Sequence, residues 1–414
     1  MRIALFAGIG LAVLALLVLV HRWLWVRLVR DTTRPGAAAR RIGTALAFAL
    51  PLLSLAALTA GRAGAPFWLQ QSVAWPGYMW LAVLLYLSLA MLVAEPVRAV
   101  LLGRRVSPRP ATDPDTPAPP AEAPAAAPGP VPAPAPAPGG ATRRQFVARA
   151  VGGAAALAAT ATVAQGTYGV LRGPRVKRVR VPLAKLPRAA HGFRIAVVSD
   201  IHLGPVLGRA HTTRIVETIN RTQPDLIAVV GDLVDGSVHD LGPAAEPLRG
   251  LRARHGSYFV TGNHEYFSGA GQWVDHVREL GLTPLENARR PLPYFDLAGV
   301  NDVAGETEGH GPDFTAALGD RDPARAAVLM AHQPIVIHDA VRHGVDLQLS
   351  GHTHGGQLWP GNYLAELANP TVAGLERYGD TQLYVSRGAG AWGPPVRVGA
   401  PSDITVVELA SYQA

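Results

Sequence analysis

Residues 193–202 read FRIAVVSDIH, and residues 226–232 read LIAVVGD. In both stretches a run of aliphatic residues, many of them β-branched, leads directly to an aspartate. Continuous apolar runs of this length are typical of strands that are covered on both faces of a sheet. The two stretches therefore predict an α/β domain in which buried strands deliver acidic side chains to one edge of a sheet.

The surrounding sequence continues this alternation of strands and helices. Helical periodicity is present at 212–221 and 272–280. Strand composition is present in seven short segments, namely 193–199, 226–230, 258–261, 327–331, 347–350, 383–386 and 404–408.

Polar clusters follow five of these strands, where an α/β sheet presents its ligand-binding residues. On an extended chain, residues i and i+2 point to the same side, so Asp200 should converge with His202, and His352 with His354. The clusters are Asp200-Ile201-His202, Gly231-Asp232, Gly262-Asn263-His264-Glu265, Ala331-His332 and Gly351-His352-Thr353-His354.

These clusters offer two carboxylates, one amide and four imidazoles, with His264 left over. A mixture of oxygen and imidazole ligands without thiolate suits Mn²⁺, which we favour, or Fe or Zn²⁺. Seven groups are too many for one tetrahedral ion, but they suit two divalent ions that share a bridging carboxylate. Such a pair activates water between the ions for displacement at phosphorus.

In this order the motifs DxH, GD, GNHE, AH and GHTH resemble the calcineurin-like metallophosphoesterase superfamily over about residues 180–410. The GHTHGGQ stretch at 351–357 is most similar to its membrane-associated bacterial subgroup. That subgroup usually has Pro-Glu-Ile near the C-terminus, where this chain has Pro401-Ser402-Asp403-Ile404. The resemblance implies a four-layer αββα sandwich, preceded here by an all-α transmembrane region.

The resemblance also implies a role for each site residue. His264 would face the substrate, where it would stabilise the transition state or protonate the leaving oxygen, and Asp232 would bridge the ions. The first ion would be held by Asp200, His202, Asp232 and His354, and the second by Asp232, Asn263, His332 and His352. Asp235 and Glu265 are expected to orient ligands. Arg387 fits a contact with substrate phosphate and a surface ion pair equally well.

The net charge of +8 suggests a nucleic-acid-binding protein until it is located along the chain. Residues 1–166 carry 15 arginines and 5 acidic residues, whereas residues 167–414 carry 23 basic and 25 acidic residues. A basic, apolar N-terminal region is typical of a membrane anchor, and the slightly acidic C-terminal part disfavours nucleic acid as a partner. The absence of cysteine excludes disulfides and thiolate sites.

Three uncharged apolar runs, at 3–20, 42–61 and 77–94, are long enough to span a bilayer. They define a membrane region at 1–106, and a Pro/Ala-rich linker follows at 107–141. Arginines cluster in the loop between the first two spans and after the third, which places both loops in the cytoplasm.

Residues 142–168 resemble a twin-arginine export signal around Arg143-Arg144, followed by a weakly apolar run that we interpret as a fourth transmembrane helix. This helix would carry the catalytic domain, residues 176–414, to the outer side of a bacterial cell membrane. The basic residues between Arg172 and Arg188 oppose this orientation, although long domains often cross regardless of charge.

The sequence thus predicts a membrane-anchored dimetal phosphoesterase in which a metal-bridging hydroxide attacks phosphorus, with diesters favoured over monoesters. An apolar segment at 355–380, with Trp359, Tyr363, Leu364, Leu367 and Leu375, could form a lip beside the site. It suggests a lipid-linked substrate such as a nucleotide-diphospho-acylsugar, with cell-envelope phosphodiesters as an equal alternative. A different class of function is a non-catalytic extracytoplasmic sensor that binds metal or phosphate.

Overall fold

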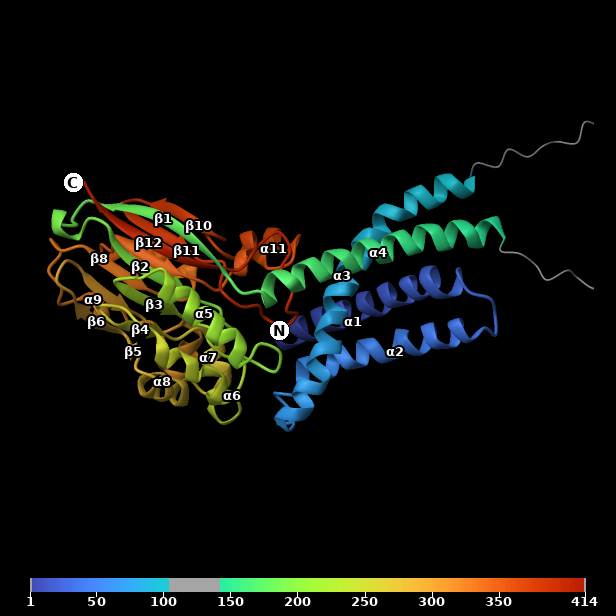
Figure 1. The fold of residues 1–414 in the computed structure, drawn as a ribbon, viewed down its shortest axis with the longest axis horizontal. Helices are drawn as coiled ribbons and strands as arrows, with labels where there is room; N and C mark the ends of the chain where they lie inside the picture. Colours follow the sequence, from blue (N-terminus) through green and yellow to red (C-terminus); the bar gives the residue numbers. More distant parts are fainter. Residues whose placement is uncertain (1, 104–141, 413–414) are drawn as a thin grey trace, which may run out of the picture. The chain divides into compact units, whose positions relative to one another are not determined.

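The structure is a computed structural model in which residues 2–103 and 142–412 are described (Figure 1). The predicted linker at 107–141 lies outside the described residues. By their internal contacts the residues group into two units, Met1–Phe48 with Leu87–Ala159, and Ala49–Tyr86 with Thr160–Ala414.

Four helices of the described residues are long and apolar enough to cross a membrane. They are α1 (Arg2–Trp25), which continues into a π-helical turn at Val26–Arg30, α2 (Ala38–Thr59), α3 (Phe67–Gly103) and α4 (Arg143–Leu171). Large apolar side chains such as Leu16, Phe48 and Leu157 are exposed on them. Helices that expose such side chains need an apolar surrounding, so this all-α region is suited to a bilayer.

The C-terminal domain contains two six-stranded mixed sheets. The first has the order β1-β12-β2-β3-β4-β5, in which β2 to β5 are parallel and β12 is antiparallel to β2. Its strands are β1 (Arg175–Leu183), β2 (Phe193–Val198), β3 (Leu226–Val230), β4 (Ser257–Val260), β5 (Thr283–Pro284) and β12 (Asp403–Ser411).

The second sheet has the order β10-β11-β9-β8-β7-β6, with a parallel centre from β11 to β7 and an antiparallel strand at each edge. Its strands are β6 (Ala288–Pro291), β7 (Asp296–Gly299), β8 (Ala327–Met330), β9 (Leu347–Ser350), β10 (Gly374–Tyr378) and β11 (Thr381–Val385).

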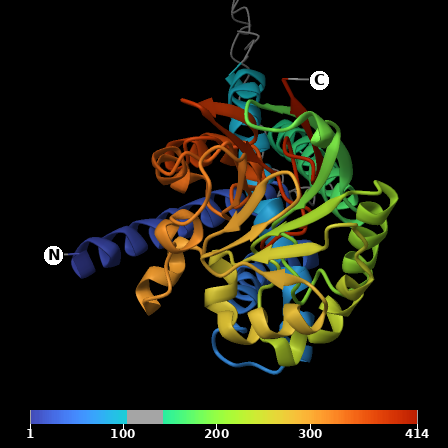
Figure 2. The same cartoon turned by 90° about the vertical axis from the view of Figure 1, so that its left-hand side faces the viewer.

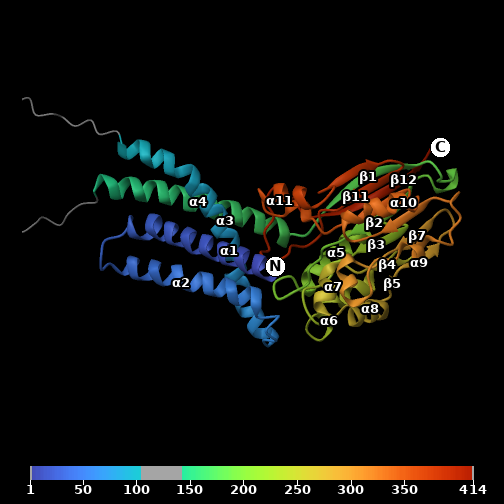
Figure 3. The same ribbon diagram turned by 180° about the vertical axis from the view of Figure 1, so that it is seen from behind.

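The sheets pack face to face through a buried core that includes Ile195, Phe295 and Tyr384 (Figure 2). A buried hydrogen bond joins them, because the Tyr384 hydroxyl lies 2.6 Å from the Thr405 hydroxyl. Helices α5 (Arg209–Arg221), α6 (Val238–Ala245) and α8 (Ala270–Glu279) cover the first sheet. Helices α9 (Phe314–Leu318) and α10 (Ile337–Arg342) cover the second (Figure 3). The predicted four-layer αββα sandwich is confirmed.

Every strand predicted from the sequence is present within a few residues of its predicted bounds, but five further strands are not predicted. The clearest is β1, whose basic residues were interpreted as charges following a membrane helix. Instead, β1 is an edge strand that pairs in parallel with β12 from Arg175 to Leu183. Its arginines are exposed while Val181 and Leu183 are buried, so pairing with a distant strand decides its structure.

Candidate metal centre

The eight site residues predicted from the sequence all follow strands at the same end of the two sheets. Strands β2, β3 and β4 of the first sheet and β8 and β9 of the second supply them. Because parallel strands share a direction, their carboxyl ends bring residues far apart in sequence to one place. The eight residues are Asp200, His202, Asp232, Asn263, His264, His332, His352 and His354.

The backbone at these residues differs from the extended chain assumed above. Asp200, His202, Asp232, His352 and His354 have φ between 49° and 73°. They are five of the eight non-glycine residues with positive φ in the described part of the chain. Asp200 and His202 converge as expected, but through left-handed turns after the strand and not through the alternation of side chains along it. His352 and His354 do not converge on one point, because they belong to different clusters. Backbone strain of this kind collects at functional sites.

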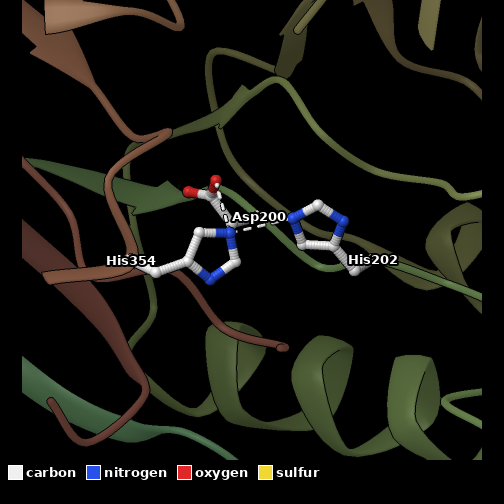
Figure 4. Close-up of side chains that lie close together, drawn as sticks. All are labelled: Asp200, His202 and His354. Atoms are coloured by element: carbon white, nitrogen blue, oxygen red, sulfur yellow. Dashed lines mark hydrogen bonds and ion pairs between the residues drawn. The ribbon is translucent and has the colours of Figure 1, made fainter. Parts of the chain in front are cut away.

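Asp200, His202 and His354 form the first cluster (Figure 4). The Nε2 atoms of His202 and His354 lie 3.0 Å apart, and His354 Nε2 lies 3.4 Å from Asp200 Oδ1. All three side chains are buried. Three inward-facing donor atoms in a buried pocket match the ligand set of one divalent cation.

Asp232, His332 and His352 form the second cluster, with Asn263 at its side. His332 Nε2 lies 3.0 Å from Asp232 Oδ2, and it is a buried atom without a directed hydrogen bond. His352 Nδ1 lies 3.0 Å from the amide oxygen of Asn263. A fully buried imidazole nitrogen that faces a buried carboxylate fits a pair of ligands for one cation.

Asp232 connects the two clusters. Its Oδ2 atom faces His332 at 3.0 Å and His202 Nε2 at 3.8 Å, while Oδ1 accepts a hydrogen bond from the His264 backbone N–H. Burial raises the pKa of this carboxyl group, but the surrounding imidazoles, His332 foremost, outweigh burial and lower it. A buried carboxylate between two groups of ligands is suited to bridging two cations.

The Glu265 carboxylate fixes the loops that carry Asp232 and Asn263. It accepts hydrogen bonds from the backbone N–H groups of Asp232 (3.0 Å), Leu233 (2.7 Å) and Gly262 (2.6 Å). Gly231 is required here because its φ is +73° and a Cβ would lie 2.7 Å from the Gly262 nitrogen. The loops after β3 and β4 are thereby held in direct contact.

Asp235 orients two imidazoles at once. Its Oδ1 atom lies 3.0 Å from His202 Nδ1 and 2.6 Å from His264 Nδ1. Burial would raise the pKa of Asp235, but His202 and His264 outweigh it and lower the pKa to about 2. A carboxylate at Nδ1 leaves Nε2 of His202 to face the first cluster and Nε2 of His264 as the nitrogen available to a substrate.

The strongly shifted pKa values of the remaining residues reflect the same crowding. Burial lowers the pKa of His202, but Asp235 outweighs burial and raises it to about 9. Burial, followed by the charge of His332, lowers the pKa of His352 to about 4. Titratable groups perturbed by both burial and neighbouring charges are typical of functional sites.

Two neighbouring residues were not identified from the sequence. The buried Arg397 guanidinium donates to the His354 carbonyl at 3.0 Å and lies 3.0 Å from His354 Nδ1. The Gln357 side chain donates to the Trp392 carbonyl at 2.9 Å and accepts from the Trp392 N–H at 3.0 Å. The GHTHGGQ motif could have suggested Gln357, whereas nothing local distinguishes Arg397. Arg387 is half-buried, and no ion pair involves it within the described residues.

Comparison with known proteins agrees with this arrangement. A family model described as calcineurin-like phosphoesterase matches residues 193–356. A metallophosphoesterase of Aquifex aeolicus is 33% identical over 240 residues, which cover 57% of this chain and 91% of the relative. The chain belongs to the calcineurin-like metallophosphoesterase family. The relatives of this family are named metallophosphoesterases, and the buried clusters described above are this chain's candidate metal ligands.

Two further metallophosphoesterases extend the comparison. The protein YkuE of Bacillus subtilis is 30% identical over 287 residues, 65% of this chain and 98% of that protein. A zebrafish protein named transmembrane protein with metallophosphoesterase domain is 38% identical over 270 residues, 61% of this chain. The chain spans only 62% of the zebrafish protein's length. The name of this relative and the four long apolar helices of this chain both indicate membrane association.

Glu265→Gln should loosen the metallophosphoesterase site. Glutamine has one accepting oxygen, so at least one of the three buried N–H groups would face an amide NH₂. An unsatisfied buried group costs about 1–3 kcal/mol, and the free energy of unfolding should fall by that amount. Chemical denaturation should measure it, with Glu217→Gln on exposed α5 as the control. Equal stability of the two variants would contradict the assigned role of Glu265.

Proposed function

We propose that the chain is a membrane-anchored dimetal phosphoesterase that hydrolyses phosphodiester or diphosphate bonds. The observation that carries the proposal is the placement of Asp232 between two clusters of candidate ligands. Asp200, His202, Asp232 and His354 would hold one cation, and Asp232, Asn263, His332 and His352 the other. Bound divalent cations would neutralise phosphate charge and activate water for an in-line attack. Mn²⁺ suits this mixture of oxygen and imidazole ligands.

We assign His264 to the leaving group. The Asp235 contact at Nδ1 fixes its ring, and the side chain remains partly accessible, with 15% of its surface exposed. When water adds to phosphorus and the ester P–O bond breaks, a proton from Nε2 would pass to the leaving oxygen. Asp232 and Asp235 thus serve different parts of the reaction, the first holding metal and the second orienting the acid.

His264→Ala and Asp232→Asn should separate these roles. With Mn²⁺ added, wild type should hydrolyse bis-p-nitrophenyl phosphate faster than p-nitrophenyl phosphate. His264→Ala should retain its metal and lose about 10²–10⁴-fold in kcat, the usual contribution of a positioned acid. Asp232→Asn should lose both metal and activity, because it changes a ligand of both ions.

Turnover and elemental analysis of the purified full-length protein would check these outcomes. Loss of metal from His264→Ala would contradict its assignment to the leaving group. Metal or phosphate binding without turnover under any divalent metal would favour the alternative function, a non-catalytic sensor.

Exposed aromatic side chains beside His264 support a substrate with an apolar part. Ring centroids of Phe267 and Trp392 lie 5.5 Å and 5.8 Å from that of His264, and both side chains are exposed. The segment after His354 adds Trp359 and helix α11 (Gly361–Ala368), in which no residue is buried. Leu375 packs against the core between the sheets, so its expected place in this lip is wrong.

A lipid-linked phosphate fits this arrangement, because its head group would meet the metal centre while its chain lies on the apolar rim. Contact with one large apolar side chain contributes about 1.5–3 kcal/mol. Trp392→Ala should therefore lower kcat/KM for a nucleotide-diphospho-acylsugar at least tenfold more than for the same compound without its acyl chain. Tyr412→Ala, an exposed aromatic residue at the far end of β12, is the matched control. Equal losses on both compounds would count against a lipid-linked substrate and leave the phosphoesterase proposal intact.

The domain is proposed to lie on the extracytoplasmic side. The support is the arginine-rich loops around the first three spans together with α4, whose Arg143–Leu171 helix directly precedes the domain. An alkaline phosphatase reporter fused after Ala414 should be active, because that enzyme needs an oxidising compartment. Activity of a cytoplasmic reporter at the same position would reverse the assignment.

A further inference from the structure

A cavity of about 140 Å³ lies where the end of α4 meets the C-terminal domain. One water needs roughly 10–15 Å³ on such a measure, so the cavity has room for a polyatomic ion. Its lining includes the guanidinium-bearing residues Arg172, Arg175 and Arg397 together with Gly169 and Ser402. No acidic residue lines it.

The walls of the cavity are held together by close packing. A Cβ on Gly166 of α4 would lie 2.6 Å from Val396 Cγ1 and 2.9 Å from the Arg397 carbonyl, so only glycine allows this approach. Val170 of α4 is fully buried against Leu207 and Ala391. The Arg175 N–H donates to the Ser402 carbonyl at 3.1 Å. The arginines therefore project from backbone that is fixed on each side.

Three of the four guanidinium groups around the cavity have no carboxylate partner among the described residues, whereas Arg397 is attracted by the buried Asp200 and Asp403. Arg214 of α5 lies beside Gly173 of the lining, and its Nε atom is buried without a hydrogen-bond partner. Arg172, Arg175 and Arg214 form no ion pair among the described residues, and Arg172 instead lies over the Tyr168 ring. Arg397 donates to the carbonyls of His354, Gly390 and Ala400, which are neutral.

A structural role at the end of α4 accounts for only part of this charge. A helix C-terminus carries about half a negative charge, so one arginine would satisfy it. The other three guanidinium groups exceed what this helix end needs. His211, one turn before Arg214 on α5, is also buried. Both of its ring nitrogens lack hydrogen-bond partners among the described residues, so few acceptors are available here.

We propose that this cavity binds a phosphate group through Arg172 and Arg175 of its lining, with Arg214 beside them next to Gly173. The planar guanidinium fork pairs with phosphate oxygens through two parallel hydrogen bonds, which suits it to this ligand. Basic pockets at the end of a membrane helix bind anionic lipid head groups, so the phosphate of an anionic phospholipid is one source and free phosphate the other. The cavity shares only Arg397 with the metal centre, and phosphate binding there does not depend on the proposed hydrolysis.

Arg172→Ala/Arg175→Ala in the full-length protein tests the site against a matched control. Arg178→Ala/Arg180→Ala removes the same charge from exposed positions of β1 that do not line the cavity. Native mass spectrometry of protein titrated with phosphatidylglycerol should show one tightly retained lipid in wild type and in the control. The cavity variant should bind it at least tenfold more weakly, with unchanged metal content and melting temperature.

A parallel titration with inorganic phosphate distinguishes the two sources. Phosphate held at the metal centre is common to both proteins, so a second bound phosphate lost only in the cavity variant would identify the free ion as the ligand. The proposal would be overturned if the two double variants retained phosphatidylglycerol equally well and also bound the same amount of phosphate. If the cavity variant lost more phosphatidylglycerol than the control variant but bound the same amount of phosphate, the ligand would be the lipid head group.

Discussion

The burial of the Asp232 carboxylate is the constraint on which the rest of the site depends. A carboxylate that is only 2% exposed must be surrounded by donors or cations, and here it lies between His332 and His202. Its loop must approach the loop after β4 closely, which requires Gly231 and the three hydrogen bonds accepted by Glu265. The strained backbone nearby follows from the need to aim several short side chains at this one point.

The two-sheet architecture makes this convergence possible. The first sheet supplies Asp200, Asp232 and Asn263, and the second supplies His332 and His352. Neither sheet alone contains a complete set of candidate ligands for either cation. The packing between the sheets, including the Tyr384–Thr405 hydrogen bond, therefore sets the distance between the two halves of the metal centre. A change in the core between the sheets would reach the site without touching any of its residues.

Arginine has three separate tasks in this chain. In the N-terminal region it marks the ends of apolar helices, and near α4 it surrounds a cavity without acidic residues. Arg397 belongs to both the cavity and the metal centre, because it lines the first and contacts His354 in the second. A phosphate bound in the cavity would thus lie near a residue that fixes a candidate metal ligand.

The buried strands, the four membrane-length helices and the set of candidate ligands were predicted from the sequence, since apolar runs and ordered motifs are local signals. Neither β1 nor the role of Arg397 was predicted, because each depends on a partner more than forty residues away. The basic edge strand β1 pairs with β12, and the buried Arg397 contacts His354. The left-handed turns that bring Asp200 and His202 together were not predicted from the sequence either. Only tertiary packing can hold several non-glycine residues at positive φ, because the strain of each must be offset by contacts made elsewhere in the fold.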